Sequence, residues 1–211
     1  AEIGALAPLD TEMPDFNKIK DTVYPGPLSS NVYKGHYYGL PLDTNTRVLI
    51  YNKDVFASAG ITTPPKTFDE MKADCDKVKA LGKADTYCYA EGGTGSWSVL
   101  PWIWSNGGDV TNPDYTKATG YLNGAATVGA VTLLKSMLDD KTLSPGILGN
   151  GIATSDAIGK AQTATILDGP WMPPIFQKQF PDLKFGMAAM PSGAEPEQAR
   201  SHGVHALHVE Q

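Results

Sequence analysis

From residue 48 onward, the chain alternates between short apolar segments of strand character and longer segments with helical periodicity. β-Branched and aromatic residues are frequent in the strand-like segments, which we expect at 48–51, 86–90, 163–167 and 184–191. Helices are expected at 54–60, 67–81, 97–105, 125–141, 155–162 and 176–180. This alternation predicts an α/β fold whose central sheet is covered by helices on both faces.

The clearest helix signal lies between Thr67 and Gly82. Thr67 is followed three residues later by Glu70, which is the spacing of a capping box, and Gly82 is typical of a helix end. One face of this helix is apolar and consists of Phe68, Met71, Cys75, Val78 and Leu81. Residues 1–39 differ, because they are rich in Pro, Asp, Gly and Tyr, with one expected short helix near 17–23. We interpret them as a peripheral or connecting segment that would not fold alone.

Length and charge narrow the classes of function. A chain of 211 residues with 41% hydrophobic content can bury on the order of 70% of its unfolded surface. The net charge of -6, with 17 scattered Lys and Arg residues, excludes a basic face for nucleic acid. No apolar run approaches the roughly 20 residues that span a bilayer. The first residues, AEIGALAPLD, fit a mature exported protein or an excised fragment equally well.

The usual sequence signatures of enzymes are absent. The sequence has no G-x-S-x-G, G-x-x-x-x-G-K-[ST] or H-E-x-x-H motif, and no G-x-G-x-x-G at a strand-to-helix turn. A hydrolase that acts on carbohydrates remains an alternative, with Asp43 and Glu91 as its carboxylate pair, since Asp43 precedes one expected strand and Glu91 follows another.

Histidine and cysteine residues leave further alternatives open. His202, His205 and His208 would share a helix face as metal ligands, but a strand is favoured there, and it would point alternate residues to opposite faces. Ordinary histidines are therefore the preferred interpretation, with a metal-binding protein as the alternative. Cys75 and Cys88 are either one structural bridge or two buried thiols.

Aromatic and polar residues gather near the expected strand ends. Trp97 and Trp171 follow glycine-containing turns, where a flat indole can face a cleft and contact the apolar face of a sugar ring, although packing in the core is the competing interpretation. Trp102 and Trp104 are expected in the core. A polar run precedes the strand at 48–51, and it consists of Asp43, Thr44, Asn45, Thr46 and Arg47. Its oxygens and amide suit neutral hydroxyl groups, and Arg47 alone could bind an anion.

The string YKGHYYGLPLDTNTRVLIYNKDVFASAGITTPPKTFDEM, followed by ILDGPWM and FGMAAMPSG, resembles the family-1 extracellular solute-binding proteins, which include the maltose-binding protein. The resemblance runs from about Gly4 to His205. It implies a type II periplasmic-binding-protein fold of two α/β lobes, with ligand held in the cleft between them and delivered to an ABC importer. It also implies no cofactor, no catalysis, and a periplasmic or extracellular location, with lipid anchoring of a full-length form left open.

Carried over to this sequence, the resemblance implies ligand contacts from the polar run 43–47, from Glu91 and from the two tryptophans. Residues 1–43 would then end the first lobe, 44–201 would form most of the second, and 202–211 would return toward the first. The family is considerably longer than this chain, and HGVHALHVE matches its usual glycine-rich return strand poorly. Because family members are exported, we also expect a Cys75–Cys88 disulfide.

Overall fold

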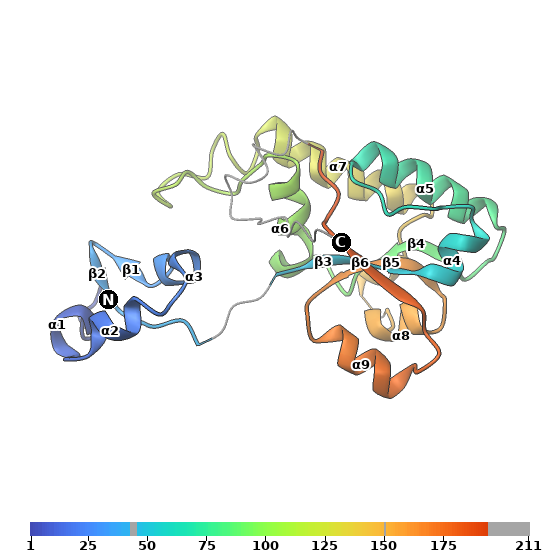
Figure 1. Ribbon diagram of the computed structural model, residues 1–211. Coiled ribbons are helices and arrows are strands. Elements are labelled where there is room, and N and C mark those ends of the chain that lie inside the picture. The colour runs from blue at the N-terminus through green and yellow to red at the C-terminus, as the bar shows by residue number, and fades with distance from the viewer. Residues whose placement is uncertain (43–45, 150, 194–211) are drawn as a thin grey trace. The chain divides into compact units, whose positions relative to one another are not determined.

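The computed structural model describes residues 1–42, 46–149 and 151–193. The chain divides into two compact units, residues 1–45 and 46–211 (Figure 1). Asp43, Thr44, Asn45 and the three histidines His202, His205 and His208 lie outside the described residues. Within the described part, no helix is long and apolar enough to cross a membrane.

The first unit consists of short elements. It contains the helices α1 (Leu9–Glu12), α2 (Phe16–Lys20) and α3 (Pro25–Ser29) and the antiparallel strands β1 (Val32–Tyr33) and β2 (His36–Tyr37). Lys34 and Gly35, both with positive φ, form the turn between the strands. The Phe16 ring is buried and lies 5.1 Å from the Tyr37 ring, centroid to centroid. The Asp10 carboxylate accepts a hydrogen bond from the Tyr37 N–H, so it ties α1 to β2.

The second unit is built around a mixed sheet, whose four strands in the described residues follow the order β4-β5-β3-β6. These strands are β3 (Val48–Asn52), β4 (Tyr87–Ala90), β5 (Thr163–Asp168) and β6 (Phe185–Ala188). β4 runs parallel to β5, whereas β3 is antiparallel to both β5 and β6. Consequently, the start of β3 and the ends of β4 and β5 lie at one edge of the sheet.

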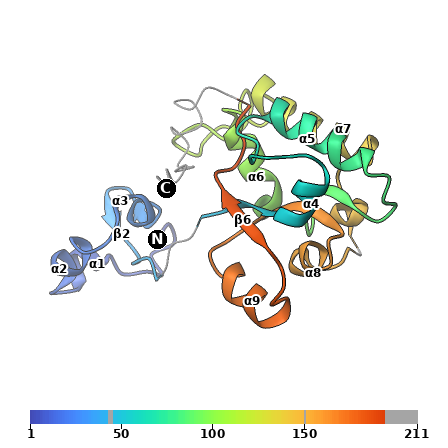
Figure 2. The same cartoon turned by 45° about the vertical axis from the view of Figure 1, so that its right-hand side comes forward.

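Helices cover both faces of this sheet, as the strand–helix alternation predicts (Figures 1 and 2). They are α4 (Lys53–Ser58), α5 (Phe68–Ala80), α6 (Ser96–Ser105), α7 (Ala125–Asp139), α8 (Thr154–Gly159) and α9 (Met172–Gln179), with a 3₁₀ turn at Pro145–Leu148. Leu49 packs in the larger apolar cluster, with α4, α5, α6 and α7. Its neighbour Ile50 packs in the smaller cluster, with α8 and α9. Successive strand residues therefore bury opposite faces of the sheet.

A side-chain cap and two prolines determine where the helices α5 and α9 begin. The Thr67 hydroxyl accepts a hydrogen bond from the Glu70 N–H, as expected for an N-cap, but the Glu70 carboxylate accepts from the Lys66 N–H rather than from Thr67. The short helix expected at 176–180 was placed too late. α9 begins at Met172, because two prolines lie in its first turn, where no N–H donor is needed.

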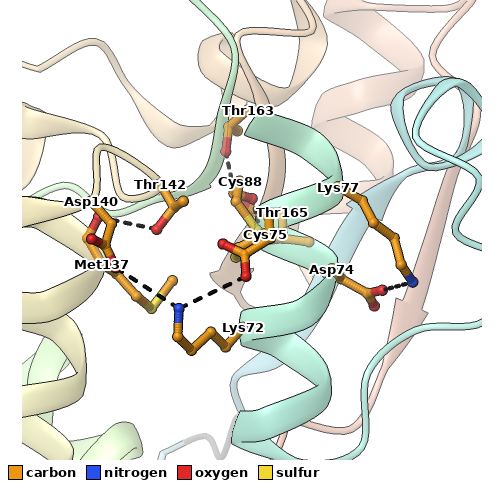
Figure 3. The surroundings of a disulfide bond; sticks show 11 residues. Lys72, Asp74, Cys75, Lys77, Cys88, Met137, Asp140, Thr142, Thr163 and Thr165 are labelled. Atoms are coloured by element: carbon orange, nitrogen blue, oxygen red, sulfur yellow. Dashed lines mark hydrogen bonds and ion pairs between the residues drawn. A yellow bond between two sulfur atoms is a disulfide. The ribbon is translucent and has the colours of Figure 1, made fainter. Parts of the chain in front are cut away.

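A disulfide joins Cys75 of α5 to Cys88 of β4 (Figure 3). Both cysteines are buried within the larger apolar cluster. The Cys88 carbonyl accepts a hydrogen bond from the Thr165 hydroxyl of the neighbouring strand β5 at 2.7 Å. This bridge therefore connects the helical layer covalently to the sheet.

Candidate functional site

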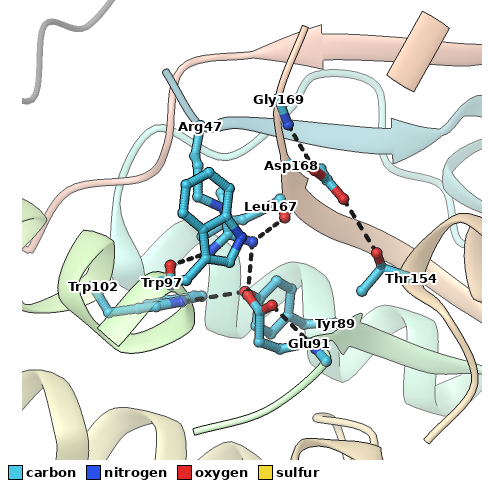
Figure 4. A network of polar contacts seen from close by, with 10 residues as sticks. Arg47, Tyr89, Glu91, Trp97, Trp102, Thr154, Leu167, Asp168 and Gly169 are labelled. Carbon is cyan, nitrogen blue, oxygen red and sulfur yellow. Dashed lines mark hydrogen bonds and ion pairs between the residues drawn. The ribbon is translucent and has the colours of Figure 1, made fainter. Parts of the chain in front are cut away.

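The candidate site lies at the edge of the sheet where β3 begins and where β4 and β5 end. Val48 pairs with Asp168, and Ala90 pairs with Ile166, so the residues just before β3 and just after β4 and β5 come together. Arg47, Glu91 and the turn 169–171 occupy these positions. Polar contacts among them are shown in Figure 4. The topology thus gathers segments that are far apart in the sequence.

Arg47 and Glu91 form a buried ion pair. The Arg47 Nη2 lies 3.0 Å from the Glu91 carboxylate, and the two side chains are only 7% and 4% exposed. Arg47 also donates from Nη2 to the Leu167 carbonyl and from Nη1 to the Trp97 carbonyl, the latter at 2.6 Å. Its Nε is buried with no hydrogen-bond partner among the described residues. The expected ligand contact of Arg47 stays a prediction, and in the structure its guanidinium contacts the Glu91 carboxylate and the Trp97 and Leu167 carbonyls.

Glu91 also accepts a hydrogen bond from a buried tyrosine. The Tyr89 hydroxyl donates to Glu91 Oε2 at 2.6 Å, and the Trp102 indole N–H donates to the Tyr89 oxygen at 3.3 Å. Burial, and then the adjacent Glu91 carboxylate, raise the pKa of the Tyr89 phenol well above its usual value. Glu91 Oε1 accepts from the Gly92 N–H. Both oxygens of the buried Glu91 carboxylate therefore accept hydrogen bonds within the protein.

Two tryptophans provide the exposed part of the site. Trp97 on α6 is 50% exposed and Trp171 is 38% exposed, whereas Trp102 is 1% exposed and belongs to the core. The Trp97 and Trp171 rings are stacked, with centroids 6.0 Å apart and planes inclined by 29°. The Arg47 Cζ lies 4.9 Å from the centroid of the Trp97 ring, which is the arrangement of a cation–π contact.

Gly169 allows Trp171 to lie close to the main chain. A Cβ at residue 169 would lie 2.2 Å from the nearest atom of the Trp171 ring, which is far inside van der Waals contact. Only glycine can occupy this position without moving the indole. The glycine of the D-G-P-W turn therefore has a packing role in the structure.

Asp168 was not singled out from the sequence. It ends β5 and is partly exposed, and its carboxylate accepts hydrogen bonds from the Gly169 N–H at 2.8 Å and from the Thr154 hydroxyl at 3.2 Å (Figure 4). Its position at a strand end, directly before the tryptophan turn, is the signal that could have identified it. Thr46 is partly exposed at the same sheet edge. Within the described residues, no group of three or more His, Cys, Asp or Glu side chains could hold a metal ion.

Comparison with known proteins finds relatives along nearly the whole chain. A protein of Brucella abortus described as a binding protein is 34% identical over 207 residues, covering 95% of this chain and 48% of that protein. The arabinooligosaccharide-binding protein of Bacillus subtilis is 29% identical over 213 residues, covering 95% of this chain and 46% of that protein. The chain therefore spans about half the length of the curated relatives it matches.

Solved structures show the same relationship. The ABC transporter solute-binding protein of Thermotoga lettingae, bound with alpha-D-tagatose, superposes with a TM-score of 0.76 at 25% identity, over 92% of this chain and 51% of that chain. The chain thus has the α/β architecture of type II periplasmic sugar-binding proteins, of which it spans about half. Residues 1–206 match the family described as bacterial extracellular solute-binding proteins, and the chain belongs to that family.

Proposed function

We propose that the chain is the ligand-binding part of an extracytoplasmic solute-binding protein, which captures a neutral sugar or oligosaccharide and delivers it to an ABC importer without chemical change. The observation that carries this proposal is the exposed, stacked pair of Trp97 and Trp171 at the sheet edge. Sugar hydroxyls are well hydrated in water, so hydrogen bonds alone gain little net free energy. Contact between an indole and the apolar face of the sugar ring supplies the missing affinity.

The charges at the site favour a neutral ligand. Arg47 is the cation closest to the tryptophan pair among the interactions that the structure describes, and it is buried against Glu91. Asp168 precedes the tryptophan turn in the chain, and its partly exposed carboxylate and the Thr154 hydroxyl bonded to it suit hydroxyl groups. An anionic ligand would instead need a free cation or several N–H donors.

The relatives support the same class of ligand. Two proteins similar to this chain are described as binding an arabinooligosaccharide and alpha-D-tagatose. We further propose that residues 1–43 end a first lobe, that 44–201 form most of the second and that 202–211 lead back to the first. The place of action would be the periplasm or the cell exterior. The hydrolase and metal-binding alternatives gain no support from these comparisons.

Titration calorimetry with D-tagatose, arabinotriose, maltotriose and glycerol phosphate tests the proposal. We expect at least one neutral sugar to bind more tightly than the anion, and chromatography after prolonged incubation to recover that sugar intact. Shortened products would identify a hydrolase. Tightest binding of glycerol phosphate would contradict the neutral-sugar claim and leave a solute-binding protein for anions.

A further inference from the structure

We propose that Arg47 is a positioning residue, which fixes the Trp97 indole relative to Trp171 and thereby sets the affinity of the tryptophan pair for its ligand. The consequence for affinity rests on the proposed sugar-binding function. The positioning itself is a property of the protein without ligand. Arg47 contacts Trp97 twice, through the main-chain carbonyl at 2.6 Å and through the ring at 4.9 Å.

The contact with the Trp97 carbonyl follows from the sequence of α6. In an α-helix, this carbonyl would accept a hydrogen bond from the N–H four residues later. That residue is Pro101, which lies inside α6 and has no N–H. The Trp97 carbonyl is therefore left without its helical donor, and Arg47 Nη1 supplies one. Arg47 thus completes the first turn of the helix that carries Trp97.

The other contacts of Arg47 anchor it to the sheet. Nη2 reaches the Glu91 carboxylate just after β4 and the Leu167 carbonyl in β5. The planar guanidinium can satisfy these separate acceptors at once, which the single ammonium of lysine cannot do in the same geometry. Trp171 belongs to the turn that follows β5, and its ring lies against Gly169. Arg47 therefore fixes Trp97 to the same part of the sheet that positions Trp171.

A simpler role for Arg47 would be to neutralise the buried Glu91. The two roles differ when both charges are removed together, because Arg47→Met with Glu91→Gln leaves no buried unpaired charge. If neutralisation were the only role, this double variant would keep the tryptophan pair in place. If Arg47 positions Trp97, the pair is lost even though the charges balance.

The stacked indoles give an optical readout that needs no ligand. Transition dipoles of stacked indoles couple, so the circular dichroism of the pair differs from that of two isolated tryptophans, and Trp97→Phe provides the reference for its loss. We expect the double variant and Arg47→Lys to lose this signal, while a cooperative thermal melt shows that both proteins remain folded. Lys77→Met, which removes an ion pair with Asp74 on α5, is the control and should keep the signal. Arg47→Lys retains a cation for Glu91, so it remains informative if the double variant fails to fold.

Affinity provides the second measurement, with D-tagatose and maltotriose titrated separately. We expect the double variant to bind the sugar roughly tenfold more weakly than the wild type. The same two substitutions, introduced into a Trp97→Ala protein, should change its affinity less than about twofold, because the effects of coupled neighbours are not additive. An unchanged optical signal in folded Arg47→Lys would overturn the proposal, and so would equal affinity losses in the two backgrounds. If neither sugar binds the wild type, the proposed function fails, and the optical measurement still decides the role of Arg47.

Discussion

At the scale of single residues, Trp171 is the most direct test of the proposed ligand contact. Replacing it by Ala should weaken sugar binding by about 2 kcal/mol or more, as truncation of aromatic anchors commonly does. The ring is 38% exposed, so the fold should survive its removal. Calorimetry measures the affinity and thermal melting measures stability. Normal binding, or a chain that no longer folds, would mean that Trp171 is a structural residue.

Gly169 tests the same contact without altering the tryptophan. A Cβ at residue 169 would meet the Trp171 ring at 2.2 Å, so Gly169→Ala should displace the indole and lower sugar affinity to a similar degree. Gly93→Ala is the matched control, because a Cβ there meets no atom of the described residues within 4 Å. Equal affinities of the two variants in calorimetry would contradict the role given to Gly169.

The buried Tyr89 phenol makes the free energy of unfolding depend on pH at alkaline values. Its pKa is raised in the folded state, so the folded protein keeps this proton at a pH where the unfolded chain, with a tyrosine pKa of about 10, releases it. The resulting stability is fully present below about pH 10 and is lost as pH rises further, at up to about 1.4 kcal/mol per pH unit.

Tyr89→Phe should therefore flatten the decline of the free energy of unfolding above pH 10, whatever its effect at neutral pH. Denaturant titrations at several pH values between neutrality and strong alkali provide the measurement. Tyr24→Phe, at an exposed tyrosine of the first unit, serves as the control. A decline as steep in Tyr89→Phe as in the wild type would refute this assignment.

At the scale of elements, the Cys75–Cys88 disulfide ties α5 to β4 across 13 residues of sequence. Closing a loop of this length stabilises the folded state by about 3 kcal/mol, mainly by restricting the unfolded chain. Removing the bridge by Cys75→Ser with Cys88→Ser should lower the free energy of unfolding by about that amount. The intact mass of the wild type, measured under denaturing conditions, should rise by the mass of two hydrogens on reduction. Two free thiols in non-reduced protein would exclude the bridge.

At the scale of the whole molecule, the second unit holds the sheet and both of its apolar clusters. The members of these clusters all come from residues beyond 46. A chain that starts at Thr46 should therefore fold, keep its disulfide and melt cooperatively, because its core is complete without residues 1–45. Calorimetric melting and far-ultraviolet circular dichroism would test this. A truncated chain that stays unfolded would show that residues 46–211 do not fold without the first unit.

The candidate site was only partly predictable from the sequence. Glycine-flanked turns identified Trp97 and Trp171 as exposed aromatics, because the local chain there permits an indole to face outward. Nothing local indicated that Arg47 and Glu91, which are 44 residues apart, would be buried against each other. Nor did the sequence indicate that Arg47 would donate to the Trp97 carbonyl in place of the N–H that Pro101 lacks. Such contacts depend on which strand ends share an edge.

The amino-acid sequence by itself determined the alternation of strands and helices, the N-cap at Thr67 and the layered α/β class, because periodicity and capping act within a few residues of the chain. Only the tertiary structure decided the order β4-β5-β3-β6 and the antiparallel direction of β3. Strand pairing depends on contacts between distant segments, which local patterns do not specify. That pairing brings Arg47 against the Trp97 ring, and so it assembles the candidate site.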